Sequence, residues 1–181
     1  LSNGSSCPED SEAGGRYCFW HDPHLNKSGE DVPERLQHWV NSGRSLEGFQ
    51  LHRAPLAEVW LTLQASDRPL DLRRANLSRT DLTGAHLYAV DLRGSSLLKA
   101  NCYDANLNGA HLERCDLLGV NFEGARLEGV HWGHYLLQEE SGHAKFRAGR
   151  REEAKAHFRE AEEVYRNLRL TTERRGQFAL S

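Results

Sequence analysis

Large apolar residues, with one cysteine among them, recur at every fifth position through the middle of this chain, and no other feature constrains its fold as strongly. The residue two positions before each of them follows the same period and is mostly small. The large positions are Leu72, Leu77, Leu82, Leu87, Leu92, Leu97, Cys102, Leu107, Leu112, Leu117, Phe122, Leu127 and Trp132. A period of five fits neither the roughly 3.6 residues of a helical turn nor the roughly two-residue alternation of a strand. The sequence therefore predicts a repeat architecture.

Each five-residue unit is expected to place two side chains inside and to turn the chain with the remaining three. Residues two apart in an extended chain point to the same side, so each pair of small and large residues faces one interior. The second residue after the large one falls at a corner, where a positive φ favours glycine. Glycine stands there at Gly84, Gly94, Gly109, Gly119, Gly124 and Gly129. The chain is therefore predicted to follow a coil with flat sides and corners.

The repeated units resemble those of a known family. The runs Ala75-Asn76-Leu77, Ala105-Asn106-Leu107 and Ala110-His111-Leu112 are similar to the A-(D/N)-L-x-x unit of pentapeptide-repeat proteins. The resemblance implies a mainly β fold, a right-handed quadrilateral β-helix with four units per coil and helical caps. For this chain it implies four to five coils.

Three regions are predicted along the chain. The repeat occupies residues 44–133, preceded by a polar segment and capping helix at 1–43 and followed by a helical segment at 134–181, which we expect to be truncated. Earlier large residues follow the same period one residue out of phase, namely Leu46, Leu51, Leu56 and Leu61. The phase slip is therefore placed at 62–69, which we interpret as a bulge or loop between coils.

A short helix is predicted from Asp31 to Gly43, ahead of the repeat. Leu36, Trp39 and Val40 share one apolar face of it, and the glycine is a typical stop signal. We expect this helix to cover the first coil, because an open coil exposes unpaired backbone groups that invite association from edge to edge.

Apolar residues recur at helical spacing beyond Trp132. They are Ala154, Phe158, Ala161, Tyr165, Leu168 and Thr172. An amphipathic helix is therefore predicted from Glu152 to Arg175, with a start nearer Ala144 as the alternative. Gly176 is expected to end it, and residues 177–180 to begin a second helix.

Two interpretations of this C-terminal segment stay open. Two helices joined at a glycine resemble one tetratricopeptide-type hairpin, whereas a single helix can pack on the last coil as a cap. The connector at 133–149 is short, so we expect docking at the end of the rod. Phe158 or Tyr165 should then lie near Trp132 or Phe122, leaving one face of the rod open to a partner.

Two cysteines and two histidines near the N-terminus suggest a metal site. Cys7, Cys18, His21 and His24 offer two sulfur and two nitrogen ligands, the number that structural zinc requires. A disulfide between Cys7 and Cys18 in an oxidising compartment is one alternative, and a packed turn with free thiols is the other. Zinc is the one cofactor that the sequence suggests.

Stacking units twenty residues apart creates columns of outward side chains. One column contains Asp71, Asp91, His111 and His131, with neighbours roughly 5 Å apart. Carboxylates and imidazoles so placed can hold a divalent cation or move a proton, and the alternative is a solvated polar surface.

A second column is apolar at two neighbouring levels. Leu98 and Leu118 are expected to lie together in water, and Tyr88 and Tyr103 add exposed aromatic rings on other faces. Contiguous exposed apolar surface tends to mark a contact, so these four residues form a predicted interaction surface.

Charge limits the classes of partner. The formal net charge is −3, and residues 70–133 carry seven basic and eight acidic side chains. Some pentapeptide-repeat proteins are DNA mimics that inhibit type II topoisomerases, a role that requires a strongly acidic rod, so this near-neutral rod disfavours it. No basic stripe with interleaved aromatic residues indicates nucleic-acid binding. No apolar run reaches the roughly 20 residues of a membrane span.

No catalytic constellation emerges from the sequence. The glycines are periodic corners rather than a phosphate-binding loop, and Cys102 and Cys115 occupy inward positions typical of core residues. The sequence therefore predicts a non-enzymatic scaffold that binds a protein partner or another domain of its own longer chain. A topoisomerase-inhibiting DNA mimic and a metal-dependent role at the N-terminal cysteines and histidines are the alternatives.

The resemblance also bears on context. Pentapeptide rods followed by helices that resemble this C-terminal segment occur as soluble parts of bacterial membrane proteins, including channel-like ones. We therefore expect a bacterial, cytoplasmic protein, held at a membrane through segments outside this chain.

Overall fold

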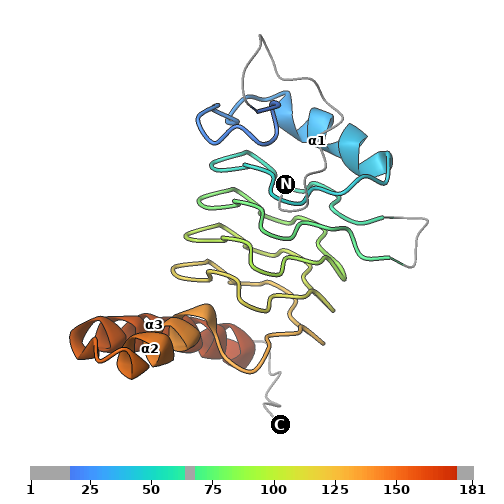
Figure 1. Ribbon diagram of the computed structural model, residues 1–181. Coiled ribbons are helices and arrows are strands. Elements are labelled where there is room, and N and C mark those ends of the chain that lie inside the picture. The colour runs from blue at the N-terminus through green and yellow to red at the C-terminus, as the bar shows by residue number, and fades with distance from the viewer. Residues whose placement is uncertain (1–16, 64–67, 175–181) are drawn as a thin grey trace.

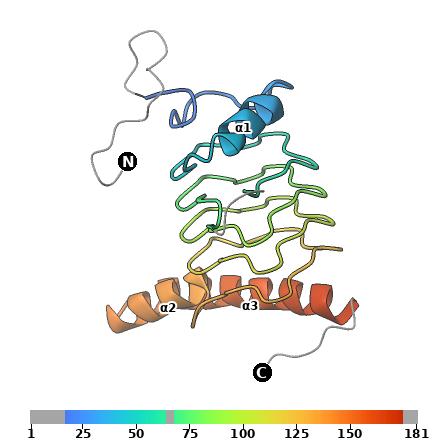
Figure 2. The same cartoon turned by 90° about the vertical axis from the view of Figure 1, so that its right-hand side faces the viewer.

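The computed structural model describes residues 17–63 and 68–174, and it shows a stack of coils with helices at both ends (Figure 1). The helix α1 (Val32–Asn41) lies over the first coil. The helices α2 (Leu137–Arg147) and α3 (Arg151–Arg174) lie side by side across the other end (Figure 2). Within the described ranges, the coils pair through isolated parallel bridges rather than through extended strands.

The bridges fix a coil of twenty residues. Four columns of bridged residues run along the stack from its second level, as in the pairs Asp71↔Asp91, Asn76↔Ser96, Asp81↔Asn101 and His86↔Asn106. Since successive columns are five residues apart, each coil has four sides of one unit each. The path is that of a quadrilateral β-helix, as the resemblance to pentapeptide-repeat proteins implies.

The first coil has a longer register than the others. Gln50 pairs with Asn76, 26 residues away, whereas Asn101 pairs with Asn121 at the usual 20. The same long register joins Trp60 to His86. Six additional residues therefore enter before Asp71, one more than a whole unit, which accounts for the shift in phase. The slip predicted at 62–69 includes residues 64–67, which lie outside the described ranges.

The interior of the rod is filled by the predicted inward residues. From Leu70 to Ala125 the small and large positions are all buried, and Leu107 is fully so. Polar inward residues donate to backbone carbonyl groups: Thr80 Oγ1 to Leu51 O at 2.7 Å and Ser95 Oγ to Leu72 O at 2.6 Å. A buried hydroxyl without such a partner is strongly destabilising, so these bonds explain why the interior tolerates it.

The corners have the left-handed backbone conformation that the glycines predict. Gly84 has a φ of 63° and Gly119 a φ of 68°. Eight other corners adopt the same conformation without glycine, at Arg53, Glu58, Arg74, Arg79, Ala89, Lys99, Asp104 and Arg114. The coil therefore imposes a positive φ at these corners whether or not the residue there is glycine.

The N-terminal cap joins the first coil through aromatic stacking and a backbone bond. Trp20 stacks on Phe49 with ring centroids 5.1 Å apart and packs edge-on against Trp39 of α1. Its carbonyl accepts a hydrogen bond from Gln50 N at 2.7 Å. In later coils the equivalent backbone N–H donates to a carbonyl of the preceding coil, as Asn76 N donates to Phe49 O. The cap therefore pairs a backbone group at the edge of the first coil.

The C-terminal helices α2 and α3 form a hairpin whose turn lies ahead of the predicted long helix. The structure breaks the helix before Arg151, at Gly149, which has a φ of 75°. The predicted turn at Gly176 and second helix at 177–180 lie outside the described residues. The turn end of the hairpin projects beyond the rod (Figures 1 and 2).

The hairpin docks at the end of the rod, as predicted, but through other residues. Val164 and Leu136 are buried in the core that continues from the rod. Phe158 packs edge-on against His143, and the Tyr165 hydroxyl donates to Glu139 Oε2 at 2.6 Å. The described contacts of both rings are with α2, and their expected approach to Trp132 or Phe122 stays a prediction.

A side chain of α3 takes over a backbone bond at the last coil. Within the rod, the carbonyl of a small inward residue accepts from the next coil, as Ala100 O accepts from Asn121 N. Val120 O lies at the last level and accepts instead from Asn167 Nδ2. Gln138 Nε2 of α2 donates to Asp116 Oδ1 at 2.8 Å. The hairpin thus satisfies polar groups that a further coil would otherwise pair.

Candidate functional site

The predicted column of carboxylates and imidazoles is present, but arginine side chains already bind its carboxylates. Arg73 Nε and Nη2 donate to the two carboxylate oxygens of Asp71 at 2.9 and 3.0 Å. Arg93 binds Asp91 in the same two-pronged way, at 2.9 and 2.6 Å. Both bonds join residues two positions apart that point outward from one side of the coil. Each carboxylate is therefore already neutralised by its own unit.

These contacts also set the ionisation of the column. Burial by itself raises the pKa of Asp91, but the hydrogen bonds from Arg93 outweigh it and hold the pKa below its usual value. Burial also raises the pKa of Asp71, but the hydrogen bonds from Arg73 and Ser45 outweigh it, so this pKa is lowered as well. Both groups are charged at neutral pH and paired, an arrangement that stabilises the stack rather than one that exchanges protons.

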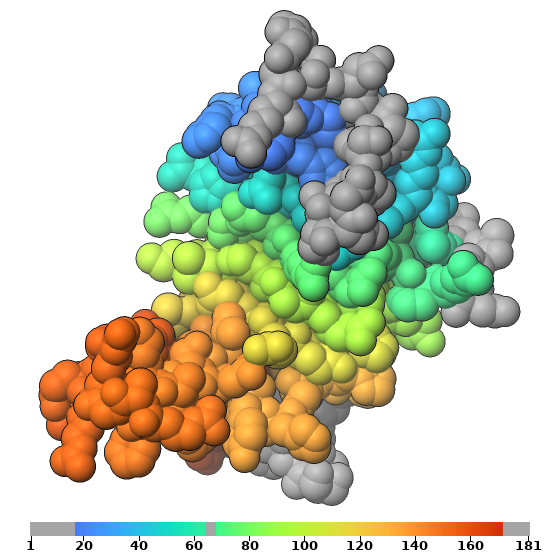
Figure 3. Space-filling view, viewed as in Figure 1, coloured from blue at the N-terminus to red at the C-terminus, as the bar shows by residue number. Residues whose placement is uncertain are grey.

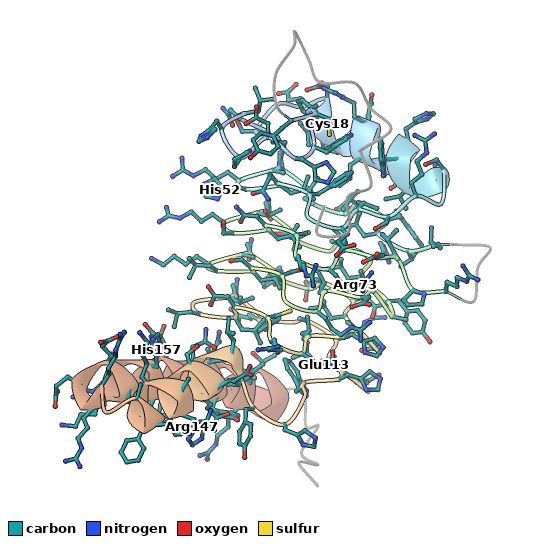
Figure 4. All side chains as sticks on the ribbon, viewed as in Figure 1. Cys18, His52, Arg73, Glu113, Arg147 and His157 are labelled. Atoms are coloured by element: carbon teal, nitrogen blue, oxygen red, sulfur yellow. The ribbon has the colours of Figure 1, made fainter. Side chains whose placement is uncertain are left out.

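The two histidines of the column stack on each other. The rings of His111 and His131 lie 4.3 Å apart and within 10° of parallel, and His111 Nδ1 is 3.3 Å from Glu113 Oε1. Figure 4 shows Glu113 on the same side of the rod as Arg73. Across residues 17–63 and 68–174, no group of three or more His, Cys, Asp or Glu side chains could hold a metal ion. The column therefore does not form the cation site considered from the sequence.

The N-terminal cysteine and histidines divide between the rod and solvent. Cys18 Sγ lies 3.1 Å from His21 Nδ1, and His21 Nε2 lies 3.1 Å from Glu47 O on the first coil. His24 is exposed, and its backbone N–H donates to Asp22 Oδ1. Cys7 lies outside the described residues, so zinc binding and a disulfide stay predictions. The described contacts tie the segment to the rod through His21.

The two cysteines of the rod are core residues. Both Cys102 and Cys115 are buried, and Cys115 Sγ donates to Leu92 O at 2.9 Å. Burial raises the pKa of each thiol to about 12. Because the thiolate is the reactive form, these side chains are poor nucleophiles at neutral pH.

The predicted apolar surface is only partly exposed. Leu98 and Leu118 are half-buried, and Leu118 packs against the core, so the expectation that both lie in water is wrong. Tyr88 and Tyr103 are exposed as predicted, by 61% and 42% of their surface.

A larger aromatic surface escaped the sequence analysis. Trp60 is 47% exposed, and its ring stacks on His86 at 3.8 Å and 14°. Tyr88 follows His86 by two positions and points outward from the same side of the coil. We call Trp60, His86 and Tyr88 the aromatic patch. Its members are hard to connect from sequence, since the pairing of Trp60 depends on the long register of 26.

Comparison with known proteins identifies the rod. Residues 70–97 and 95–131 match the family model of pentapeptide repeats, in eight copies. The chain contains a pentapeptide-repeat domain. The pentapeptide repeats predicted from the sequence are thereby confirmed over these residues. No curated protein matches the sequence.

Solved pentapeptide-repeat proteins are similar over part of their length. Rfr23 from the cyanobacterium Cyanothece 51142 is 35% identical over 49% of this chain and 63% of its own, with a TM-score of 0.35. HetL from Nostoc sp. PCC 7120, involved in heterocyst differentiation regulation, is 28% identical over 54% and 50%, with a TM-score of 0.35. QnrB1, a plasmid-mediated fluoroquinolone resistance protein, is 18% identical over 45% and 54%, with a TM-score of 0.18. This chain thus spans half to under two thirds of the length of these three proteins.

No helix within the described ranges is both long enough and apolar enough to cross a membrane. The longest, α3, has charged residues throughout its length.

Proposed function

We propose that this pentapeptide-repeat protein is a non-enzymatic scaffold that binds another protein, or another domain of the same longer chain, through the aromatic patch. The observation that carries the proposal is the Trp60 ring, which remains 47% exposed although it stacks on His86. A large aromatic surface in water is unfavourable, and covering it on binding releases that free energy.

The position of the patch suits a protein partner. Trp60 and His86 lie at the centre of one side of the rod, and the next levels of that column carry the polar residues Asn106 and Arg126. Tryptophan and tyrosine surrounded by polar groups are the residue types that dominate binding energy in protein interfaces. The bond from Trp60 N to Gln37 Oε1 of α1, at 3.2 Å, ties the patch to the N-terminal cap.

Three further observations support a scaffold without catalysis. The inward positions of the rod are filled by packed side chains. Arginines neutralise the ordered carboxylates of the rod surface, on Asp71 and Asp91. Burial raises the pKa of the Cys102 and Cys115 thiols to about 12. These packed side chains, paired carboxylates and buried thiols are typical of a rigid body, and none of them presents a reactive group to a substrate.

Site-specific photo-cross-linking tests the proposal. The photoreactive residue benzoylphenylalanine is placed at Tyr88, within the patch, or at Tyr103, which is exposed on another side of the rod. In extracts of the source organism, we expect Tyr88 to capture one defined protein that Tyr103 does not.

The same capture is then repeated with Trp60→Ala as a second substitution. We expect the cross-link from position 88 to be lost while the circular dichroism of the protein is unchanged, since Trp60 is a surface residue. Equal capture at both positions, or capture that survives Trp60→Ala, would show that the patch does not bind the partner.

A further inference from the structure

Three basic side chains form a line along one corner of the rod. Arg53, Arg79 and Lys99 occupy the same corner at successive levels, and we call them the basic ridge. Backbone bonds hold them in line: Arg53 N donates to Ser78 O at 3.1 Å, and Arg79 N to Leu98 O at 2.8 Å. His52 comes directly before Arg53 in the sequence. In Figure 4, His52 lies on the side of the rod from which the hairpin projects. The backbone positions that carry neighbouring ridge side chains are therefore about 4.8 Å apart along the axis, the distance between paired strands.

The ridge differs from the other basic corners in having no internal partner. Arg74 pairs with Glu47 at 3.3 Å, and Arg114 binds both carboxylate oxygens of Glu140 in α2 at 2.9 Å. The three ridge side chains are exposed, and no acidic group of the described residues lies within ion-pair distance of them. Two corner arginines thus fasten the fold, and the ridge is left for something outside it.

Backbone conformation makes these three residues an unfavourable choice for the fold alone. Their φ angles are 59°, 57° and 56°. This is the left-handed region, in which the backbone of a residue with a Cβ atom is strained and that of glycine is not. The next level of the same corner has Gly119, at a φ of 68°. Glycine would avoid that strain, so the backbone conformation does not itself require basic side chains at these three corners.

We propose that the basic ridge binds an acidic amphipathic α-helix of a partner protein, aligned with the axis of the rod. Acidic side chains three or four residues apart on a helix rise by about 4.5 or 6 Å, which brackets the spacing of the ridge. An extended peptide repeats one face at about 6.6 Å and loses register over three levels. The half-buried Leu98 and Leu118 lie beside the ridge and offer an apolar strip to the other face of the helix.

Charge on the neighbouring corner argues against nucleic acid as the occupant. Glu58 and Asp104 occupy that corner, also at a positive φ, and both are exposed. A phosphate backbone is anionic along its whole length, and proteins that bind duplexes usually contact more phosphates than three side chains can neutralise. A helix with one acidic face avoids that repulsion. The hairpin projects beyond the lower end of the coils (Figure 3), and the three ridge side chains above it are exposed.

Fluorescence anisotropy with a synthetic peptide tests the proposal. The probe is a labelled helix with glutamates at every third or fourth position on one face and leucines on the adjacent face. We expect binding that weakens with added salt. A scrambled peptide of the same composition, which has no acidic face, should bind much more weakly, as should a labelled DNA duplex.

The variant Arg79→Gly with Lys99→Gly separates binding from folding. Two lost ion pairs should weaken binding about fivefold, since an exposed pair contributes a factor of about two to three. The melting temperature should stay the same or rise, because glycine suits the corner. The matched control is Arg126→Gln with Arg166→Gln, two exposed arginines outside the ridge. It should bind the peptide as tightly as the natural protein does. Equal binding of the scrambled peptide, tighter binding of the duplex, or unchanged affinity of the glycine variant would overturn the proposal.

Discussion

At the scale of single residues, the position within a five-residue unit decides which way a side chain points. This rule follows from the sequence alone and holds from Leu70 to Ala125. The ion pairs of Asp71 with Arg73 and of Asp91 with Arg93 were not predicted, although their signal is visible as an aspartate followed by an arginine two positions later, repeated after twenty residues. Their geometry depends on the rotamers of outward side chains on one side of the coil, which periodicity does not describe.

Leu107 offers the simplest test of the inward rule. Its side chain is fully buried, so Leu107→Ala should lower the free energy of unfolding by about 2–5 kcal/mol. Leu107→Asp should prevent folding, because a carboxylate inside the rod has no partner. The control Asn106→Asp places the same carboxylate one position away, on the outside. Urea unfolding should find that control close to the natural protein, and a stable Leu107→Asp protein would refute the register.

The pairing of Asp91 predicts a pH dependence of stability. A carboxyl whose pKa is lowered by folding stabilises the protein above its unfolded pKa of about 4, and that contribution is lost as the pH falls through the lower folded pKa. Asp91→Asn should therefore reduce the free energy of unfolding at pH 7 by about 1 kcal/mol, since Arg93 is half exposed and solvent screens the pair.

The measurement is urea unfolding of both proteins at a series of pH values. The difference between them should shrink below about pH 4. Asp104→Asn, at an exposed corner with no ion pair among the described residues, serves as the control and should make little difference at any pH. A difference for Asp91→Asn that stays constant down to the acid limit would contradict the assigned role.

At the scale of elements, the helices show what hydrophobic spacing does and does not reveal. The helix predicted from Asp31 to Gly43 is observed as α1, and its apolar face is buried as expected. The helix α2 was missed, because its sequence has no apolar stripe and contains Gly142, which resembles a break. Its stability comes from contacts with α3, which no local pattern can report. The stripe of α3 is correct in type but rotated, with Val164 rather than Tyr165 buried.

Gly142 is predicted to be required by packing rather than by backbone conformation. A Cβ atom there would lie 2.7 Å from Phe158 Cε1, closer than real contacts allow. Gly142→Ala should therefore destabilise the protein by about 1–3 kcal/mol, although alanine favours helices. The double variant Gly142→Ala with Phe158→Leu removes the clash and should recover part of the loss. Thermal unfolding measures both, and a stabilised Gly142→Ala protein would show that α2 and α3 do not pack as described.

At the scale of the whole molecule, the period of five predicts the stack, and the structure adds how its ends are closed. The first coil is covered by α1 and aromatic stacking, and the last by the α2–α3 hairpin. Trp60 and His86 of the aromatic patch lie at the centre of a side of the rod that does not adjoin the corner of the basic ridge, so the two proposed contacts are on separate surfaces. Neither surface could be assembled from the sequence until the residues of successive coils were aligned. Both therefore depend on the stacking register, which is the central claim.

Cross-linking of engineered thiols measures that register directly. Asn121 Nδ2 donates to Asn101 Oδ1 at 2.9 Å, so these side chains lie together on successive coils. In a Cys7→Ser background, Asn101→Cys with Asn121→Cys should be bridged by dibromobimane, a reagent that becomes fluorescent when it joins two nearby thiols. Cys102 and Cys115 should not react, because both are buried and burial raises the pKa of each thiol to about 12.

The decisive comparison is with a pair that a coil of twenty-five residues would bring together. Asn101→Cys with Arg126→Cys places the thiols on neighbouring sides of the rod, because Arg126 pairs with Asn106 instead. The stacking described here predicts strong fluorescence for the pair at positions 101 and 121 and none for the pair at 101 and 126. Fluorescence from the second pair, or its absence from the first, would contradict the register and with it both proposed surfaces.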